Sequence, residues 1–299
     1  MTLYCKKILT HTLDKIDGDV SVELQNLINE NNSIHLPAGV YEIHNTIVLN
    51  KNNFTLTGES GTILRKTADV HLLEIHGNNN KIDTIQFDGN SKNYSVVFLN
   101  GNNNVINHCK FYNSLSHGLC IDGQLNVTSY NEVNGCYMYD NEHIGLAQHK
   151  GSNTRITNNL IFNNGWEGLT IDIQSHDTIV DSNKLFGNCW RDGGGEGAIG
   201  IDDSNNNIIS NNIIDGPHRD NSLLGGITFA NNIGNCERNV IIGNVIKNTR
   251  GYPIFIRNKN GITANYNVIN SNVCFGNNLT IIKLDDGCVG NIIEHNLVN

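Results

Sequence analysis

A short alternating pattern returns along most of the chain, and it constrains the fold more than any other feature of the sequence. Each copy reads small, apolar, small, apolar, polar, with minor variation. Alternation over such a length is typical of a β-strand. The copies that end at residues 122, 149, 172 and 202 are 27, 23 and 30 residues apart, which indicates a repeat architecture. The clearest copies are 118–122, 145–149, 168–172 and 198–202.

Two columns of residues keep step with each other over nearly the whole repeat region. The first column, made of the last residue of each copy, contains Asn100, Asp122, His149, Asp172, Asp202, Ala230, Arg257 and Asp285. The second contains Cys109, Cys136, Asn159, Asn183, Asn212, Asn244, Asn272 and Asn296. We therefore predict a solenoid of about three short strands per turn, in which each coil contacts only its neighbours. Stacked Asn side chains are expected to hydrogen-bond along one bend.

The composition agrees with a coil of strands. Hydrophobic residues make up 38% of the chain and charged residues 16%. The 3 Pro residues are few, as expected where nearly every backbone N–H must reach the next coil. The formal net charge of −9 argues against nucleic-acid binding, which needs a basic surface. Apolar runs stay short of the roughly 18 residues of a membrane span, so we expect no membrane contact.

The cysteines and the chain ends give three further expectations. The 8 Cys residues lack paired CxxC spacing, so we expect buried free thiols and no structural zinc. The N-terminal residues lack the apolar run of a signal peptide, so we expect a cytoplasmic or virion-associated protein unless a leader was removed. No cap is evident after Val298. A bare last coil predicts a homo-oligomer, either a trimer or a dimer.

The N-terminal region predicts a cap and carries a family resemblance. Residues 20–31 place Val20, Leu24 and Ile28 on one helical face, as expected of a helix that covers the first coil. The following segments 36–41 (LPAGVY) and 56–59 (LTGE) resemble the start of pectate-lyase-like right-handed parallel β-helix proteins. The resemblance implies an all-β, single-stranded right-handed parallel β-helix of about ten coils. We expect one domain over 1–299, with a lead-in and cap at 1–32 and coils at 33–299.

The first column predicts a groove on the outer face. Coils of a solenoid stack about 4.8 Å apart, so the column becomes a ladder of polar side chains. The outward residues two positions earlier are small in the middle of the chain: Cys120, Ala147, Thr170, Gly200 and Thr228. A polar ridge beside a small floor makes a shallow groove that suits an extended glycan. The inserted loops 188–197 and 216–225 are expected to wall this groove.

Asp172, Asp202 and Asp203 are the strongest catalytic candidates. Carboxylates one coil apart cannot all ionise freely, so the pKa of one should rise, as acid–base cleavage of a glycosidic bond requires. Their order, followed by Arg257-Asn-Lys259, is similar to the polygalacturonase pattern. The chain departs from that pattern at 225–229 (GGITF), where a Gly-His-Gly motif would stand.

The remaining site candidates surround these carboxylates. His149 lies between Asp122 and Asp172 in the ladder and is expected to act as a base or to contact a sugar, with His117 and His143 nearby. The spacing of Asp122, His149 and Asp172 is not diagnostic of a metal, so no metal site is predicted. The expected substrate-binding residues, among them two Trp that would stack on sugar rings, are Asp122, Arg257, Lys259, Trp166, Glu167 and Trp190.

These features predict a carbohydrate-active protein with a polysaccharide substrate that is extended and acidic. A glycoside hydrolase without a cofactor is the first hypothesis. A polysaccharide lyase or uronate epimerase is an alternative, in which Arg257 or Lys259 removes the proton next to a uronate carboxyl and Ca²⁺ holds that carboxylate. The superfamily also contains tailspikes and proteins of no known activity, and the fold does not choose among them. The other alternative is therefore a non-catalytic glycan-binding or structural β-helix of a viral or phage particle.

Overall fold

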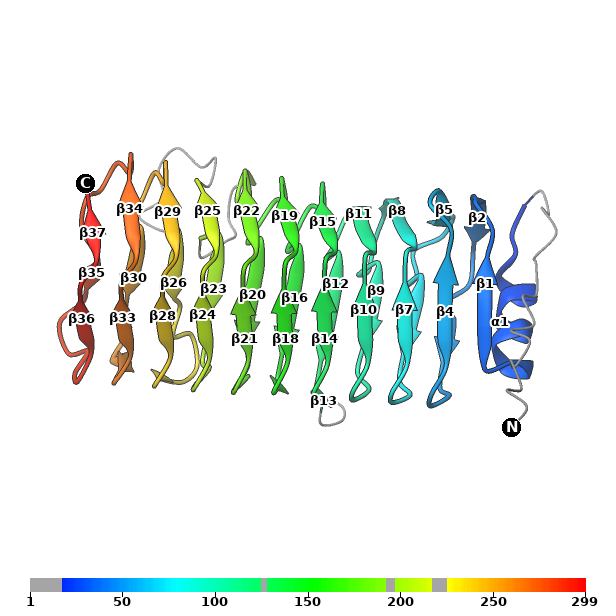
Figure 1. Ribbon diagram of the computed structural model, residues 1–299, viewed down its shortest axis with the longest axis horizontal. Helices are drawn as coiled ribbons and strands as arrows, with labels where there is room; N and C mark the ends of the chain where they lie inside the picture. The colour runs from blue at the N-terminus through cyan, green and yellow to red at the C-terminus, as the bar shows by residue number, and fades with distance from the viewer. Residues whose placement is uncertain (1–17, 125–127, 192–196, 217–224) are drawn as a thin grey trace, which may run out of the picture.

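The protein is a parallel β-solenoid with a single short helix at its N-terminal end (Figure 1). The computed structural model describes residues 18–124, 128–191, 197–216 and 225–299. Within these residues, two long sheets contain 11 strands and a third contains 10, and successive strands of the chain pass to successive sheets. The predicted all-β solenoid of about ten coils is confirmed.

Each of the first ten described coils contributes one strand to each long sheet, and the last contributes β36 and β37 to the first two. All pairs within these sheets are parallel. The first sheet contains β1 (Ser33–Leu36), β4 (Thr55–Gly58), β7 (Lys81–Asp83), β10 (Val105–Asn107), β14 (Glu132–Asn134), β18 (Arg155–Thr157), β21 (Ile179–Asp181), β24 (Ile208–Ser210), β28 (Val240–Ile242), β33 (Val268–Asn270) and β36 (Ile292–Glu294). The second contains β2 (Gly39–Ile43), β5 (Thr62–Lys66), β8 (Gln86–Lys92), β11 (Lys110–Ser114), β15 (Tyr137–Tyr139), β19 (Leu160–Phe162), β22 (Lys184–Phe186), β25 (Ile213–Asp215), β29 (Val245–Lys247), β34 (Val273–Phe275) and β37 (Leu297–Val298). The third contains β3 (Ile47–Leu49), β6 (Leu73–Ile75), β9 (Val97–Leu99), β12 (Leu119–Asp122), β16 (Leu146–His149), β20 (Leu169–Asp172), β23 (Ile199–Ile201), β26 (Ile227–Phe229), β30 (Ile254–Ile256) and β35 (Lys283–Leu284). Two small sheets add β13 (Thr128–Ser129) and β17 (Gly151–Ser152), and β27 (Cys236–Glu237), β31 (Asn258–Lys259) and β32 (Ile262–Asn265).

Helix α1 (Ser21–Glu30) covers the first coil, as the spacing of its apolar residues predicts. Leu24 and Ile28 are fully buried in the core. Gln25 also binds the edge strand β3: its side chain accepts a hydrogen bond from Val48 N (2.7 Å) and donates one to Val48 O (3.0 Å). The helix therefore covers the apolar end of the solenoid and satisfies part of its exposed edge.

Asparagine side chains stack along the bends. In the predicted column, Asn159 N donates to Asn183 Oδ1 (2.9 Å) and Asn183 N donates to Asn212 Oδ1 (2.9 Å). Cys136, one coil earlier, donates its N–H to Asn159 Oδ1 (2.8 Å), so the two cysteines of the column occupy ladder positions. Two further Asn ladders, which the sequence analysis did not predict, run along the other bends. One contains Asn80, Asn104 and Asn131 and, further along the same bend, Asn207, Asn239, Asn267 and Asn291. The other contains Asn141, Asn164 and Asn188.

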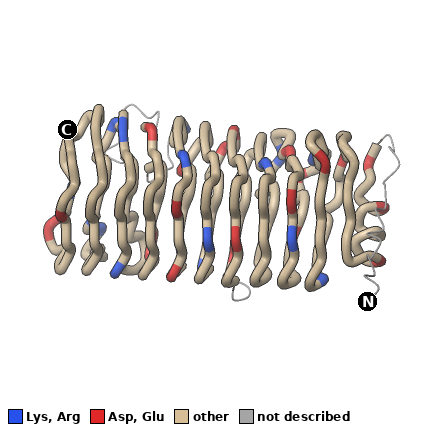
Figure 2. The backbone as a smooth tube through the Cα atoms, in the orientation of Figure 1, with Lys and Arg blue, Asp and Glu red and all other residues tan. Residues whose placement is uncertain are grey.

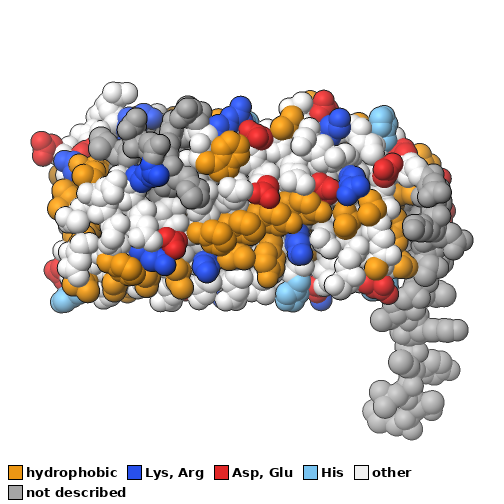
Figure 3. Space-filling view, turned by 90° about the horizontal axis from the view of Figure 1, so that it is seen from above, with side chains coloured by type: hydrophobic (Ala, Val, Ile, Leu, Met, Phe, Trp, Pro, Cys, Tyr) orange, Lys and Arg blue, Asp and Glu red, His pale blue; other side chains and the backbone are white. Residues whose placement is uncertain are grey.

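Charged residues are sparse along the coils, and most of the backbone drawn in Figure 2 carries neither Lys or Arg nor Asp or Glu. On the second sheet Tyr112, Tyr139, Phe162 and Phe186 form a continuous stack with ring centroids 4.8 to 5.0 Å apart. A band of hydrophobic side chains runs along the length of the face shown in Figure 3. Within the described residues, none of the helical structure is long and apolar enough to cross a bilayer.

We expect the Asn ladder to be a main source of stability. Asn183→Ala removes four hydrogen bonds, two accepted from Asn159 and one each donated to Ile156 O and Asn212 Oδ1. Because the partners are buried, the free energy of unfolding should fall by about 2 kcal/mol or more. The measurement is urea unfolding followed by circular dichroism. The control is Asn29→Ala in the exposed face of α1, which should change stability by less than about 0.5 kcal/mol. Equal midpoints for the two variants would contradict this role.

Candidate active site on the third sheet

The outward positions of the third sheet form the predicted floor and ladder in register. Cys120 pairs with Phe98 on one side and Ala147 on the other. The floor continues through Thr170, Gly200 and Thr228 on successive strands. Inward neighbours such as Ile121 and Ile171 are fully buried in the core. Strand alternation therefore presents the small floor and the polar ladder on the same outer face.

His149 lies between two carboxylates of the ladder. It pairs with Asp122 and Asp172 on the adjacent strands. Its Nδ1 is 3.9 Å from Asp122 Oδ2, and its Nε2 is 4.0 Å from Asp172 Oδ2. Burial disfavours the protonated ring, but the nearby Asp122 carboxylate, the contact with Cys120 Sγ and the negative charge of Asp172 outweigh this and raise the pKa of His149 to about 10. The ring is therefore a cation at neutral pH, held between two acids.

Asp172, Asp202 and Asp203 converge next to this histidine. One carboxylate oxygen from each lies within 4.8 Å of the others. Burial is the main cause that raises the pKa of Asp202 to about 7, and the charges of Asp172 and Asp203 add to it. Burial also raises the pKa of Asp172, although the positive charge of His149 opposes this shift. The neighbouring carboxylates therefore differ in their protonation at neutral pH.

The bend that follows Asp172 is unusual. Ile173 has φ of 52°, in the left-handed region that β-branched residues rarely adopt. Its N–H donates to Asp172 Oδ1 at 2.5 Å, which fixes the carboxylate at the end of its strand. Strained backbone of this kind often lies at functional sites.

The loop after β26 holds the other two carboxylates. Asp203 is buried, and its Oδ1 accepts hydrogen bonds from Ile233 N (2.8 Å) and Gly234 N (2.6 Å). Asn232 donates its backbone N–H to Asp202 Oδ1 (2.8 Å) and its side-chain amide to Asp202 Oδ2. Lys259 in turn donates to the side-chain oxygen of Asn232. Asp203 therefore anchors the loop, and Asn232 links Lys259 to Asp202.

Three histidines and a tryptophan form the N-terminal side of the site. The His117 ring centroid lies 5.7 Å from that of His143 and 6.2 Å from that of His149. Burial, followed by the positive charges of the neighbouring histidines, lowers the pKa of His117 to about 3, so this ring stays neutral. His143 stacks face to face on Trp166 at 4.2 Å. The predicted proximity of these histidines is thus present.

The other predicted binding residues differ in their exposure to solvent. Trp190 is 40% exposed, and its Nε1 donates to Asn163 O (3.0 Å). Trp166 is only partly exposed, and one of its faces is covered by His143. Glu167 is buried, so it offers little surface to a ligand. Arg257 lies over the ring of Phe255, a floor residue.

The two predicted wall loops fall partly outside the described residues, at 192–196 and 217–224. A pocket of about 560 Å³ lies at the bend directly after the ladder. Because Gly123, Lys150 and Gln174 line it, the pocket adjoins Asp122, His149 and Asp172 along the chain. The rest of its lining is polar or basic: Ser152, His176, Asn205, Asn206 and Arg238.

Sequence reasoning missed several of these residues. Asn232 and the loop 231–235 have no counterpart in the repeat, so no periodic signal marks them. Lys150 and His176 lie in bends, where side-chain direction does not follow from strand alternation. The position of Cys120 near the ladder could have been predicted, because it lies two positions before Asp122 in the same strand and so faces the same side of the sheet.

Comparison with known families agrees with this architecture. A family described as right handed beta helix region matches residues 16–185 and 71–232. The chain belongs to this family. Pectate lyase L of Thermoclostridium stercorarium is 27% identical in an alignment of 190 residues, and the match covers 58% of this chain and 14% of the relative. The chain therefore spans only a small part of that relative's length.

Solved structures share the fold at low sequence identity. The protein named Geobacillus virus E2 - ORF18 matches with a TM-score of 0.73 and 17% identity, over 92% of this chain and 56% of its own. The Dettilon tailspike protein matches with a TM-score of 0.70 and 14% identity, over 95% and 64%. An alginate lyase from Paenibacillus sp. str. FPU-7 matches with a TM-score of 0.64 and 12% identity, over 93% and 97%. Together with the family match, these structures confirm the predicted right-handed parallel β-helix.

The raised pKa of Asp202 predicts a pH-dependent stability. Between the ordinary value of 3.8 and about 7, the folded protein retains a proton that the unfolded chain has released. Stability contributed by this group is therefore present below pH 4 and is lost as the pH rises toward 7. Asp202→Asn should gain thermal stability relative to the unmodified protein as the pH rises from about 4 to about 8.

Thermal unfolding at several pH values, followed by circular dichroism, measures this difference. Asp285→Asn is the matched control, because it changes an aspartate of the same column away from the cluster. Its offset from the unmodified protein should stay constant with pH. Parallel curves for both variants would show that the Asp202 carboxyl titrates normally.

Proposed function

We propose that the chain is a polysaccharide-degrading enzyme of the glycoside hydrolase type, which binds an extended acidic glycan along the outer face of the third sheet. The observation that carries this proposal is the cluster of Asp172, Asp202 and Asp203. These carboxylates lie within 4.8 Å of one another, and the pKa of Asp202 is raised to about 7. Carboxyl groups of unequal acidity are what hydrolysis of a glycosidic bond requires.

Asp202 and Asp172 have complementary roles in this proposal. Asp202 carries a proton for part of the time at neutral pH and donates it to the leaving glycosidic oxygen. Asp172 is the ionised partner that acts on the anomeric carbon, directly or through a water molecule, and the cation of His149 favours its ionised form. Asp203 is held by backbone N–H groups of the loop and acts as a positioning residue.

The basic groups near the cluster support an acidic substrate. Lys259 contacts Asn232, which itself contacts Asp202, so this cation lies close to the reacting bond. Arg257 lies over the floor at Phe255. Lys150 and Arg238 line the pocket on the other side of the ladder. In a protein with a net charge of −9, such a local gathering of cations favours the binding of carboxylate-bearing sugars.

The relatives add a carbohydrate context. Proteins named pectate lyase and alginate lyase share the fold, and their names describe action on acidic polysaccharides. A lyase, in which Arg257 or Lys259 would remove the proton next to a uronate carboxyl, is the less favoured hypothesis for this chain, because the tightest cluster on the ladder consists of the carboxylates Asp172, Asp202 and Asp203. A glycan-binding β-helix of a phage particle is the second candidate, favoured by the matches to a viral protein and to tailspikes.

A panel of pectins, alginates and bacterial capsular polysaccharides tests this proposal. We expect new reducing ends without the ultraviolet absorbance of unsaturated uronates. Reducing ends accompanied by that absorbance would instead identify a lyase. Binding to a polysaccharide without any cleavage would favour the phage-particle alternative.

Variants, assayed with a polysaccharide that the protein cleaves, test which residues carry out the reaction. Asp202→Asn and Asp172→Asn should each lower turnover by about two orders of magnitude or more, as loss of general acid–base catalysis does. Asp285→Asn, in the same column but distant from the cluster, should keep full activity. The rate should also fall as the pH rises through about 7, where Asp202 loses its proton. Full activity in both cluster variants would place the site elsewhere.

A further inference from the structure

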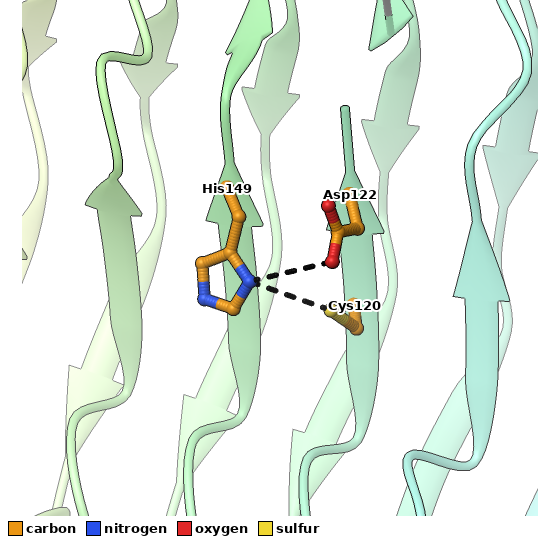
Figure 4. A group of neighbouring side chains, drawn as sticks. All are labelled: Cys120, Asp122 and His149. Carbon is orange, nitrogen blue, oxygen red and sulfur yellow. Dashed lines mark hydrogen bonds and ion pairs between the residues drawn. The ribbon is translucent and has the colours of Figure 1, made fainter. Parts of the chain in front are cut away.

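Cys120, Asp122 and His149 bring a thiol, a carboxylate and an imidazole together on two adjacent strands. The Cys120 Sγ and the Asp122 Oδ2 are each 3.9 Å from His149 Nδ1. The three ligand atoms all lie within 4.8 Å of one another (Figure 4). The strand pairing Asp122 to His149 and Cys120 to Ala147 fixes their backbone positions. We propose that these three residues form a binding site for a divalent transition metal ion of the Zn²⁺ class.

The distances suit such an ion after a small contraction. Zinc binds sulfur at about 2.3 Å and nitrogen or oxygen at about 2.0 to 2.2 Å in tetrahedral geometry. Ligand atoms around it are therefore about 3.3 to 3.6 Å apart. Side-chain rotations that bring Cys120 Sγ and Asp122 Oδ2 closer to His149 Nδ1 by a few tenths of an ångström reach these two distances. A thiolate, an imidazole and a carboxylate form a mixed donor set that favours zinc and its neighbours over Ca²⁺ or Mg²⁺, which prefer oxygen ligands.

The surroundings supply a second set of contacts. The other ring nitrogen of His149 faces Asp172 Oδ2 at 4.0 Å. A carboxylate in that position orients metal-bound imidazoles in many proteins. Asp122 Oδ1 accepts a hydrogen bond from Gln124 N at 2.7 Å, which leaves Oδ2 directed at the ring. Two of the three ligands, His149 and Asp122, are therefore contacted by a neighbour that does not itself bind the ion.

Burial leaves one side of the site open. Cys120 is buried on the floor against Ile144 and Ala147. The side chains of Asp122 and His149 keep 17% and 16% of their surface exposed. A bound ion would have three protein ligands and a fourth position toward the groove for water or a sugar hydroxyl. Three protein ligands with an open position distinguish catalytic from structural zinc sites.

The test uses the full chain, freed of metal with a chelator and then titrated with Co²⁺ or Zn²⁺. We expect one ion per chain and, with Co²⁺, the near-ultraviolet absorption band of a thiolate bound to the metal. Cys120→Ser should abolish this band, and His149→Gln should weaken Zn²⁺ binding more than 100-fold. Asp172→Asn should weaken it by about 10- to 100-fold, as loss of an orienting carboxylate does. The controls are Cys274→Ala, a buried thiol elsewhere, and Asp285→Asn, and neither should change the band or the affinity.

Three results would overturn the site. The first is the absence of a thiolate band in the unmodified protein. The second is retention of the band in Cys120→Ser. The third is metal binding that produces no thiolate band and that is lost in Asp203→Asn. This result would place the ion on the acidic cluster instead. Circular dichroism of each metal-free variant confirms that its fold is intact, so that a lost band reports a lost ligand.

Discussion

The structure depends on the in-register parallel pairing of each strand with the equivalent strand of the next coil. Every residue in a paired strand then has a counterpart of the same orientation about 4.8 Å away. Inward positions such as Ile121 and Ile171 stack into a long, thin core, and bend positions such as Asn159 and Asn183 stack into hydrogen-bonded ladders. The same constraint acts on the outer face, where it has chemical rather than structural consequences.

In-register stacking places ionisable groups closer than unrelated surface residues would lie. Asp122, His149 and Asp172 alternate in sign along the ladder, so the histidine becomes a cation with a pKa of about 10. Between Asp172 and Asp202 the charges no longer alternate in sign, and burial, with the like charges added to it, raises the pKa of Asp202 to about 7. Regular stacking of the coils therefore places groups with different pKa values side by side along the ladder. A cleavage site and a metal site can share one ladder because each needs only two or three consecutive coils.

Much of this was predictable from the sequence, because periodicity also determines which residues are neighbours in space. The spacing of Asn159, Asn183 and Asn212 predicted their ladder, and the ladder order predicted that His149 lies between Asp122 and Asp172. What escaped prediction lies where the period is interrupted. Asn232 reaches Asp202 from a loop that no repeat matches. The approach of Cys120 to His149 depends on side-chain rotation, which spacing does not specify. The roles assigned to these groups stay predictions until activity is measured.

The most direct test of the account is a crystal structure of the Asp202→Asn variant soaked with a mixture of oligogalacturonides and alginate oligosaccharides. The account predicts a sugar chain along the outer face of the third sheet, between β16 and β30. A glycosidic oxygen should lie within hydrogen-bonding distance of residue 202, and a carboxylate of the sugar should point toward Arg257 or Lys259. A sugar chain bound on the outer face of the second sheet, with the ladder uncovered, would contradict it.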